Sequence, residues 1–376
     1  MGGVQRRMNG GKHEPYDATK PFNEHIRELI RATHPDGGPL AVVPEGKRFR
    51  VELHPSFVAA HYGARYPDGM GTKGKLHWEM DTLENGARDA LAMVFDDAIE
   101  SGRVPIELVD HLMVQEEDEG RIFRIIKKLS DLCIEHQWPV SNGTTYPVAI
   151  TAGETAILDT IQGFELGVTA IAYAMKGHVI TPIIRPGDAV IGIASSGVHS
   201  NGITFLREAF EGRRMDLDHQ LPWGTSVGRE LTVPTNIYLP AIRALIDEFR
   251  EGDIPANRFI TGMVHITGGG FYKLKKELIG DRRDIDIEIT RAHGLDPQEI
   301  FKFAQREFKV TSGNMYMRFN NGIGYVVVVS GHREGDALEV LNRHFKAETI
   351  GRVVEGIGKV RIESKYESNN VVYSAR

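Results

Sequence analysis

The stretch with the clearest chemical potential spans residues 194–204 and reads ASSGVHSNGIT. It follows an apolar run at 188–194 with the length and β-branching of a buried strand, and it precedes the apolar spacing of a short helix at 203–210. A strand that opens into a helix presents unpaired backbone N–H groups at the positive end of the helix dipole, which suits a phosphate. The side chains that can add hydrogen bonds are Ser196, His199, Ser200 and Asn201. On residue types alone, a Ser- and Asn-rich turn with a helix cap is an equally good interpretation.

A second candidate lies nearer the N-terminus, where residues 68–73 read DGMGTK. The Asp68 carboxylate could ligate a hard cation, and the Lys73 ammonium could neutralise phosphate oxygens. Because Asp-Gly is also a common turn, this string alone is weak evidence for a site.

Two further strings carry carboxylates and a histidine. Asp96 and Asp97 lie in the C-terminal part of a helix expected at 89–102, where the helix dipole and their mutual repulsion oppose ionisation. A bound cation would relieve both penalties, and a solvated acidic patch is the alternative. His265 begins the string HITGGG, in which three glycines let the backbone wrap a ligand, although a hinge or turn would use them too.

Composition limits the class of protein. The chain has 376 residues, enough for two domains, and is 41% hydrophobic and 26% charged, as in soluble globular proteins. A net charge of −6 favours neither nucleic acid nor an anionic membrane as a partner. The longest apolar stretch, at 166–175, is too short for a membrane span, and residues 1–15 have no secretory apolar region and are expected to form a flexible leader. The single cysteine, Cys133, excludes an intrachain disulfide, fits a reducing cytoplasm and is expected to be a small core residue.

Periodicity predicts the elements that must position these strings. Helices are expected at 21–32, 118–137 and 239–249, and strands at 48–53, 166–175 and 325–329. Strands broken by glycine are expected over 350–362, and the last ten or so residues have the composition of a disordered tail.

In order and spacing, these strings resemble the motifs of the aminoimidazole ribonucleotide synthase family, the phosphoribosylformylglycinamidine cyclo-ligases. The loop at 194–204 is similar to Ser-Ser-Gly-Pro-His-Ser-Asn-Gly, with Val198 in place of Pro. Residues 68–73 are similar to Asp-Gly-Val-Gly-Thr-Lys, and HITGGG is similar to His-Leu-Thr-Gly-Gly-Gly. Further likenesses are 152–156 to Gly-Gly-Glu-Thr-Ala, 231–238 to Leu-x-x-Pro-Thr-x-Ile-Tyr, and 311–324 to Glu-Met-Tyr-Arg-Thr-Phe-Asn-x-Gly-Val-Gly.

The chain also departs from the family pattern. Asp97 takes the Asp position of the family's Val-Asn-Asp, whereas Asp96 replaces the Asn and could alter metal or substrate contacts. The family's Met-Pro-Gly-Met-Tyr segment is replaced by Ile-Leu-Asp at 157–159, and its N-terminal glycine loop is matched only at 37–40.

The resemblance implies an α/β fold of mixed sheets in two domains. The expected bounds are 1–36 for a leader and helix, 37–177 for an N-terminal domain that binds ATP and metal and forms the dimer, 178–364 for a C-terminal α/β domain, and 365–376 for a tail. It also implies a homodimer in which the N-terminal sheets of two subunits form a shared barrel.

The resemblance further implies roles for individual residues. The catalytic candidates are His199, His265 and Asp97, and the candidate metal ligands are Asp68, Asp97 and Glu154. Substrate or phosphate contacts fall to Ser195, Ser196, Gly197, Ser200, Asn201, Thr267, Gly268, Gly269 and Asn320, and nucleotide contacts to Gly69, Gly71, Thr72, Lys73 and Thr155. The two histidines are expected to hydrogen-bond or protonate the reacting group, because a near-neutral pKa suits that work.

The implied activity is ATP-dependent closure of formylglycinamidine ribonucleotide to 5-aminoimidazole ribonucleotide in purine biosynthesis, with Mg²⁺, and with K⁺ as a further candidate ion. Hydroxide is a poor leaving group, so phosphorylating the formamide oxygen would let it depart as phosphate when the amidine nitrogen attacks. The expected partners are a small phosphorylated substrate and a second copy of the chain, without nucleic acid or membrane. Two alternatives stay open: a relative that uses ATP to activate a different amide or phosphorylated substrate, and an inactive homologue that binds such a ligand as a regulator.

Overall fold

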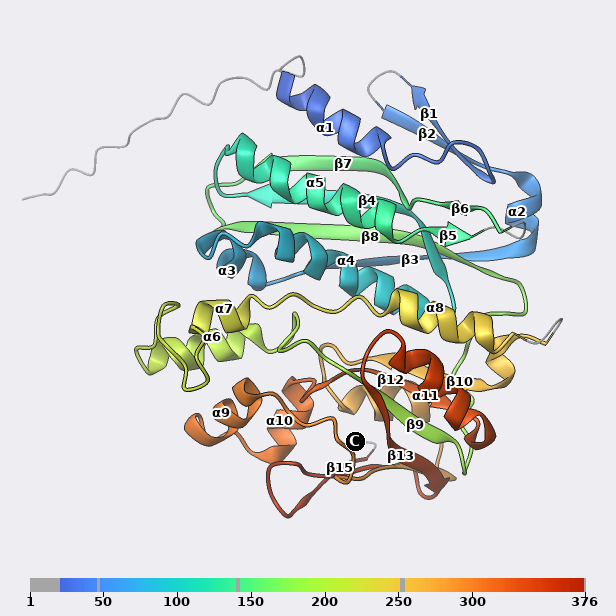
Figure 1. The fold of residues 1–376 in the computed structure, drawn as a ribbon, viewed down its shortest axis with the longest axis vertical. Coiled ribbons are helices and arrows are strands. Elements are labelled where there is room, and N and C mark those ends of the chain that lie inside the picture. The colour runs from blue at the N-terminus through green and yellow to red at the C-terminus, as the bar shows by residue number, and fades with distance from the viewer. Residues whose placement is uncertain (1–20, 46–47, 140–142, 251–253, 375–376) are drawn as a thin grey trace, which may run out of the picture.

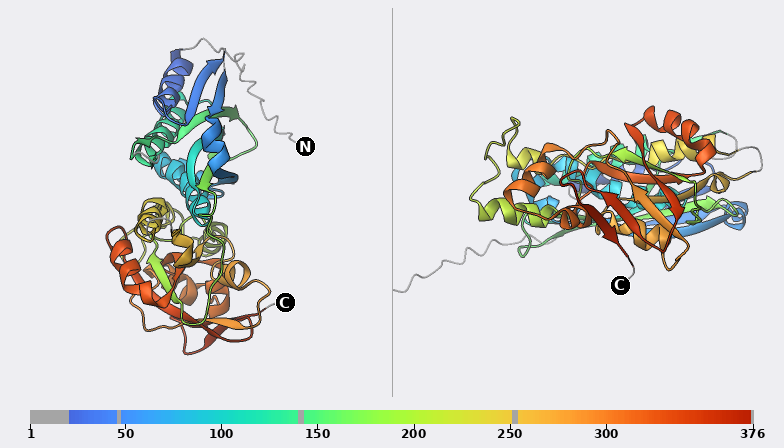
Figure 2. Two further views of the ribbon diagram at one scale, coloured as in Figure 1. Left: turned by 90° about the vertical axis from the view of Figure 1, so that its right-hand side faces the viewer. Right: turned by 90° about the horizontal axis from the view of Figure 1, so that it is seen from below.

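The computed structural model describes residues 21–45, 48–139, 143–250 and 254–374. They form two α/β domains, seen as two lobes in the side view of Figure 2. The flexible leader predicted at 1–15 lies outside the described residues. None of the helices in the described ranges combines the length and apolar composition that a membrane span requires.

The N-terminal domain is built on a four-stranded sheet with the order β3-β8-β4-β7. Its strands are β3 (His61–Gly69), β4 (Val104–Val114), β7 (Ala149–Ile157) and β8 (Phe164–Met175), and only the β4–β7 pair is parallel. Helices α4 (Leu83–Ile99) and α5 (Glu119–Glu135) cover one face (Figure 1). The strands alternate accordingly, since Leu166 and Val168 of β8 are buried while Thr169 is half-exposed on the other face.

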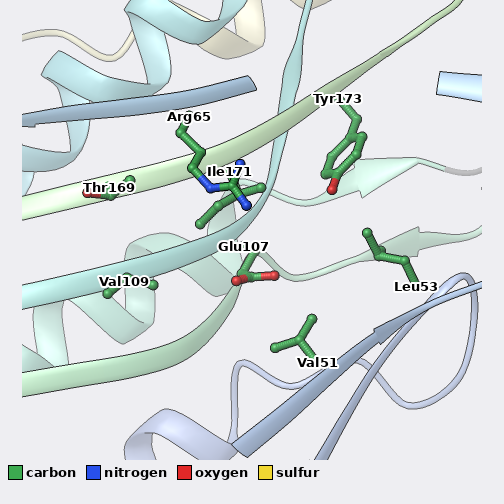
Figure 3. Close-up of a pocket in the computed structure, with 8 residues that line it drawn as sticks. All are labelled: Val51, Leu53, Arg65, Glu107, Val109, Thr169, Ile171 and Tyr173. Carbon is green, nitrogen blue, oxygen red and sulfur yellow. The ribbon is translucent and has the colours of Figure 1, made fainter. Parts of the chain in front are cut away.

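The smaller elements of this domain flank the sheet. They are α1 (Pro21–Arg31), the hairpin of β1 (Leu40–Glu45) and β2 (Arg48–Leu53), α2 (Pro55–Ala60), α3 (Lys73–Glu79), and the short pair β5 (Trp138–Pro139) and β6 (Thr145–Tyr146). On the sheet face that α4 and α5 leave uncovered lies a hollow of about 440 Å³, into which Arg65 of β3 and Glu107 of β4 project (Figure 3).

The C-terminal domain contains a seven-stranded mixed sheet with the order β10-β12-β9-β13-β11-β14-β15. Its strands are β9 (Ala189–Ala194), β10 (Ile260–His265), β11 (Ile285–Ile289), β12 (Ile323–Val329), β13 (Ala347–Glu355), β14 (Val360–Glu363) and β15 (Asn370–Tyr373). The helices are α6 (Ile203–Gly212), α7 (Val227–Leu231), α8 (Leu239–Glu248), α9 (Glu299–Glu307), α10 (Ser312–Arg318) and α11 (Glu334–Asn342). Single turns are η1 (Ala256–Arg258) and η3 (Gly331–Arg333), and η2 (Leu274–Ile279) is a π-helix.

The two domains meet along α4 and α8 (Figure 1). One continuous hydrophobic cluster contains Phe95 of α4, Leu245 of α8 and Ile191 of β9, all fully buried. The domains therefore share part of one core, which fixes the end of α4 against the C-terminal sheet.

Most elements expected from periodicity are confirmed within one or two residues, including the strand and helix around 194–204. Cys133 is buried on α5, as expected. The helix expected at 89–102 instead begins at Leu83 and ends at Ile99. Gly86 lets it start earlier, since a Cβ there would lie 2.5 Å from the Phe164 ring.

The expectation of a disordered tail is wrong for the described residues. Residues 370–373 form β15, which pairs with β14 at the sheet edge. Val371 and Tyr373 are buried and alternate with exposed neighbours, which is the pattern of a strand with one face covered. The polar composition of the last ten or so residues had suggested disorder.

Candidate functional site

The centre of the candidate site is a contact between the two domains. Asp97, near the end of α4, lies with its Oδ1 3.1 Å from Nδ1 of His265, the last residue of β10. Burial lowers the pKa of the His265 imidazole. Burial is the largest single effect on Asp97 and opposes its ionisation, but the hydrogen bond from His265 and the electrostatic interactions with His265 and Lys273 together outweigh it, so the pKa of Asp97 is lowered. The pair is therefore a carboxylate that accepts a hydrogen bond from the Nδ1–H group of a neutral imidazole.

Two charged residues that the sequence reasoning missed surround this pair. The Lys273 ammonium donates to the carbonyl oxygen of His265 at 2.9 Å and to Oγ1 of Thr267 at 3.0 Å. Glu100 accepts the backbone N–H of His265, and its carboxylate lies 4.0 Å from Lys273. A signal for Lys273 was present, because this lysine follows the glycines of HITGGG by three residues and could neutralise an anion held by that loop.

The glycine-rich string at 68–73 reaches the same place from the N-terminal sheet. Asp68 is the last residue but one of β3 and interacts electrostatically with Asp97, His265 and Lys273. Burial, with a smaller contribution from the Asp97 charge, raises the pKa of Asp68. Glu165, also missed from the sequence, accepts the N–H of Gly71 at 3.2 Å.

These carboxylates limit how a metal could bind. Among the described residues, no three His, Cys, Asp or Glu side chains are arranged to hold a metal ion. Asp68 and Asp97 are nevertheless two carboxylates of the kind Mg²⁺ uses when substrate phosphates supply its other ligands.

The side chains of two predicted nucleotide-binding residues, Thr72 and Lys73, have protein partners. Thr72 is exposed, and its hydroxyl lies 2.8 Å from that of Thr204 in α6. Lys73 is fully buried: its ammonium lies 2.8 Å from Asp89 and donates to the carbonyl of Val233 at 2.7 Å. His77 contacts the same Asp89 carboxylate at 2.8 Å. The Lys73 ammonium is thus engaged by Asp89 of its own domain and by the Val233 carbonyl of the other domain. The string DGMGTK alone could not reveal these contacts.

The loop from Ser195 to Gly202 connects β9 to α6, and buried Asn320 supports it from behind. The amide nitrogen of Asn320 donates to the carbonyl of Gly197, and its oxygen accepts from the hydroxyl of Ser195. The Ser196 hydroxyl donates to the carbonyl of Pro234 at 2.6 Å. In the described part of the chain, the N–H groups of Gly197, Val198 and Ser200 have no protein acceptor. The loop therefore keeps backbone donors for an anion while its supporting side chains are already engaged.

His199 occupies the tightest position of this loop. Its φ is +60°, a conformation that residues other than glycine seldom adopt and that clusters at functional sites. Its Nε2 accepts the N–H of Ser196 at 3.2 Å, which leaves the proton on Nδ1, a buried atom without a partner among the described residues. Burial lowers the pKa of His199 to about 3.

The low pKa values correct one expectation. A near-neutral pKa was expected for both histidines, but burial lowers it for each, so both are neutral at physiological pH. The buried Tyr238 ring lies between them, 6.2 Å from each imidazole. Such groups can donate or accept hydrogen bonds to a substrate without carrying charge.

The HITGGG loop lies beside the first loop. A Cβ on Gly268 would be 3.5 Å from Oδ1 of Asn201, and the amide nitrogen of Asn201 is buried without a partner among the described residues. Gly269 has a φ of +94°, and a Cβ on Gly270 would be 2.3 Å from the carbonyl of Tyr316. The glycines thus allow a close backbone approach next to the unpartnered amide.

Two candidates lie apart from this cluster. Glu154 and Thr155 are exposed on β7, at the opposite sheet edge from Asp68. Three strand spacings, about 14 Å, separate the β3 and β7 edges. Within one chain, Glu154 is therefore not brought to the Asp68–Asp97 group.

Comparison with known proteins covers most of the chain. Family models described as the N-terminal and C-terminal domains of AIR synthase related protein match residues 66–173 and 185–363. A phosphoribosylformylglycinamidine cyclo-ligase of Methanocaldococcus jannaschii is 31% identical over 87% of this chain and 91% of its own. One from Thermococcus kodakarensis is 36% identical over 81% and 82%.

Solved structures share the fold at low sequence identity. Thiamine-monophosphate kinase from Stenotrophomonas maltophilia superposes with a TM-score of 0.60 at 15% identity, covering 92% of this chain and 96% of that one. E. coli HypE gives 0.59 at 17%, covering 94% and 97%. T. maritima PurL complexed with FGAR gives 0.52 at 17%, covering 92% of this chain and 49% of that one.

Proposed function

The chain belongs to the AIR synthase related family, and from this premise we propose that it is a phosphoribosylformylglycinamidine cyclo-ligase. It would close formylglycinamidine ribonucleotide to 5-aminoimidazole ribonucleotide at the expense of ATP. The observation that carries the proposal is the junction at which Asp97 of one domain meets His265 of the other, beside a loop with free backbone donors. The relatives that share 31–36% identity over most of their length carry this enzyme name.

The reaction needs a leaving group and a folded substrate. ATP transfers its γ-phosphoryl group to the formamide oxygen, and the amidine nitrogen then attacks the formamide carbon that bears this oxygen. The C–O bond breaks, inorganic phosphate leaves with the bonding electron pair, and the nitrogen loses a proton. Because the attack is intramolecular, the enzyme contributes mainly positioning and charge neutralisation.

The two loops hold the substrate. The free N–H groups of Gly197, Val198 and Ser200 receive its ribose phosphate at the start of α6. Asn201 and the glycines at 268–269 line the neighbouring wall. Neutral His199 and His265 hydrogen-bond the formamide and amidine groups, and their low pKa values keep positive charge away from the attacking nitrogen.

The nucleotide side depends on charge. Lys273 is positioned to neutralise the phosphoryl group in transfer, because its ammonium lies next to His265 and Thr267. Asp68 and Asp97 would hold Mg²⁺, which would offset phosphate charge when bound. A cation there also relieves the repulsion that contributes to the raised pKa of Asp68.

We infer that a second copy of the chain packs on the sheet face that α4 and α5 leave uncovered. The hollow sheet face shown in Figure 3 combines apolar side chains such as Val109 and Ile171 with Arg65 and Glu107, which suits closure against an equivalent sheet. In such a homodimer, Glu154 on the exposed strand β7 would serve the partner subunit. The buried, unpaired Cys133 fits action in a reducing cytoplasm.

A coupled assay tests the proposal. The purified protein is incubated with ATP, Mg²⁺, K⁺ and formylglycinamidine ribonucleotide, and ADP and the aminoimidazole product are measured together. Equal amounts of both are expected. Nucleotide binding or hydrolysis without aminoimidazole would assign the site to another substrate, and absence of both would indicate a regulator.

A further inference from the structure

Residues 233–239, here called the bridging segment, lie between α4 and the loop at 195–202. On the α4 side, Asp89 accepts the N–H of Thr235 at 2.6 Å. Two helical turns further on, Asp96 accepts the N–H groups of Tyr238 and Leu239 at 2.7 and 2.9 Å. Both aspartates are fully buried, and both reach from the N-terminal domain into the C-terminal one.

Asp96 supplies what the start of α8 lacks. Tyr238 caps this helix and Leu239 is its first residue, so their N–H groups have no acceptor within the helix. Tyr238 makes no side-chain cap of its own, and a carboxyl oxygen of Asp96 from α4 takes the place of that cap. Asp96 therefore contacts the start of α8, whereas its neighbour Asp97 contacts His265. The Asn-to-Asp difference at position 96 falls on a contact between the domains.

The other side of the bridging segment holds the loop at 195–202, here called the phosphate loop. The Tyr238 hydroxyl donates to the carbonyl of Ala194 at 2.8 Å, and Asn236 donates to the same oxygen at 3.2 Å. Ala194 is the last residue of β9, directly before the loop. Ser196 returns a hydrogen bond to Pro234. The backbone of this segment is thus fixed by α4, and its side chains fix the loop.

Tyr238 has little freedom to move in this arrangement. Its ring is fully buried between the imidazoles of His199 and His265. A Cβ on Gly324 would lie 2.1 Å from its hydroxyl oxygen, so the neighbouring strand is already in close contact. A shift of the Tyr238 backbone must therefore displace Ala194 or the histidines.

We propose that Asp96 is a positioning residue for the phosphate loop, acting through the backbone and hydroxyl of Tyr238. Adjacent residues of α4 then serve the two halves of the site: Asp97 faces the nucleotide side, and Asp96 holds the substrate side in register with it. This inference rests on the proposed function for the identity of the substrate. The hydrogen bonds that connect Asp96 through Tyr238 to Ala194 do not depend on that identity.

Substitutions separate positioning from general stability. Asp96→Ala removes the acceptor, whereas Asp96→Asn keeps an oxygen for the two N–H groups. Tyr238→Phe removes only the hydroxyl that reaches Ala194. Asp286→Ala is the matched control, because Asp286 is also buried and accepts two backbone N–H groups, at 2.8 and 2.7 Å, but lies on β11, two strands from β9.

The first measurement is calorimetric titration of each full-length variant with formylglycinamidine ribonucleotide, alongside the KM for ATP. We expect Asp96→Ala to weaken substrate binding about tenfold while the KM for ATP stays within about twofold, and Asp96→Asn to restore most of the binding. Tyr238→Phe should weaken binding in the same direction, and the Asp96→Ala/Tyr238→Phe double variant should be less impaired than the product of the two single effects. Asp286→Ala should lower stability without changing substrate affinity.

The second measurement uses the ligand-free protein. Hydrogen exchange of the amides of residues 194–196, whose N–H groups have protein acceptors, should accelerate in Asp96→Ala and Tyr238→Phe, and remain near wild type in Asp96→Asn and Asp286→Ala. Unchanged exchange and affinity in folded Asp96→Ala, or equal losses in Asp286→Ala, would overturn the inference. If the wild-type protein fails to bind the ribonucleotide, the proposed function falls, while the exchange data still decide the role of Asp96. If Asp96→Ala does not fold, Tyr238→Phe decides it.

Discussion

His265 and Asp97 are 168 positions apart in the chain, yet Nδ1 of one lies 3.1 Å from Oδ1 of the other. Asp97→Ala is expected to reduce ATP turnover about 10²- to 10³-fold while leaving the fold intact, because it removes both a candidate metal ligand and the hydrogen-bond acceptor of His265. ADP release and circular dichroism check this. The control is Asp131→Ala on α5, which removes an exposed ion pair with Lys127. Unchanged kinetics in Asp97→Ala would remove this residue from the site.

The Lys73–Asp89 pair is expected to matter for stability first. Lys73→Met leaves the fully buried Asp89 carboxylate without its charged partner, so the free energy of unfolding should fall by about 3–5 kcal/mol, and Lys73→Met/Asp89→Leu should recover part of it. Denaturant titration measures the loss. Lys75→Met, at a partly exposed lysine 3.8 Å from Glu79, should cost less than about 1 kcal/mol. A raised KM for ATP with unchanged stability would instead give Lys73 the nucleotide contact predicted from its motif.

Acid should destabilise the protein through His199. Its folded pKa of about 3 lies below the ordinary value of 6.5, so its contribution is present above pH 6.5 and is lost as the pH falls toward 3. Between pH 7.5 and 5.0 this amounts to about 2 kcal/mol of unfolding free energy. Asparagine tolerates the positive φ at this position. Between pH 7.5 and 5.0, the free energy of unfolding of His199→Asn should therefore fall by about 2 kcal/mol less than that of the wild type. His332→Asn, at an exposed position, controls for removal of any histidine, and an identical pH dependence in wild type and His199→Asn would contradict the prediction.

Gly324 should tolerate no side chain. In Gly324→Ala the new Cβ would lie 2.1 Å from the Tyr238 hydroxyl oxygen and 2.6 Å from Cε1 of His199, so about 1–3 kcal/mol of stability and most of the substrate affinity should be lost. Thermal melting and substrate titration measure both effects. Gly335→Ala in α11 meets no atom within 4 Å and should not lower stability. Equal behaviour of the two alanine variants would show that the space around Gly324 relaxes freely.

Sedimentation should show a dimer that depends on the hollow sheet face. Val109→Asp places a charge in this hollow, and it is expected to shift the protein to monomers. Val372→Asp, at an exposed residue of β15 in the other domain, should leave the dimer unchanged. A wild-type monomer, or a dimer that resists Val109→Asp, would place the interface elsewhere.

The strand–loop–helix at 188–212 could be predicted because each part has a local signal: a β-branched run, then small polar residues, then helical spacing. The fold class followed from the order of motifs along the chain. The contact between Asp97 and His265 has no local signal, because it depends on how α4 packs against β10. Only the joint presence of the motifs indicated that the two residues belong to one site.

Burial explains most of what could not be predicted. The string DGMGTK gives Lys73 the chemistry of a phosphate ligand, but its partner Asp89 comes from another helix and is visible only in the packed structure. The same applies to the two histidines, whose pKa values depend on how completely the protein excludes water from them. Glu165 carried no periodic or motif signal, and the position of Lys273 three residues after the glycines of HITGGG was too weak a signal to single it out, although both lie beside predicted residues.

The hydrophobic cluster that runs from α4 through α8 to β9 makes each half of the chain depend on the other. Each half of the chain, produced alone, would expose apolar side chains that the other half normally covers, so separate halves should aggregate. The intact chain should melt in a single cooperative transition, because neither lobe keeps a complete interior once the other unfolds. Catalytic cycling would then proceed by small adjustments of loops over a rigid frame, without the lobes swinging apart.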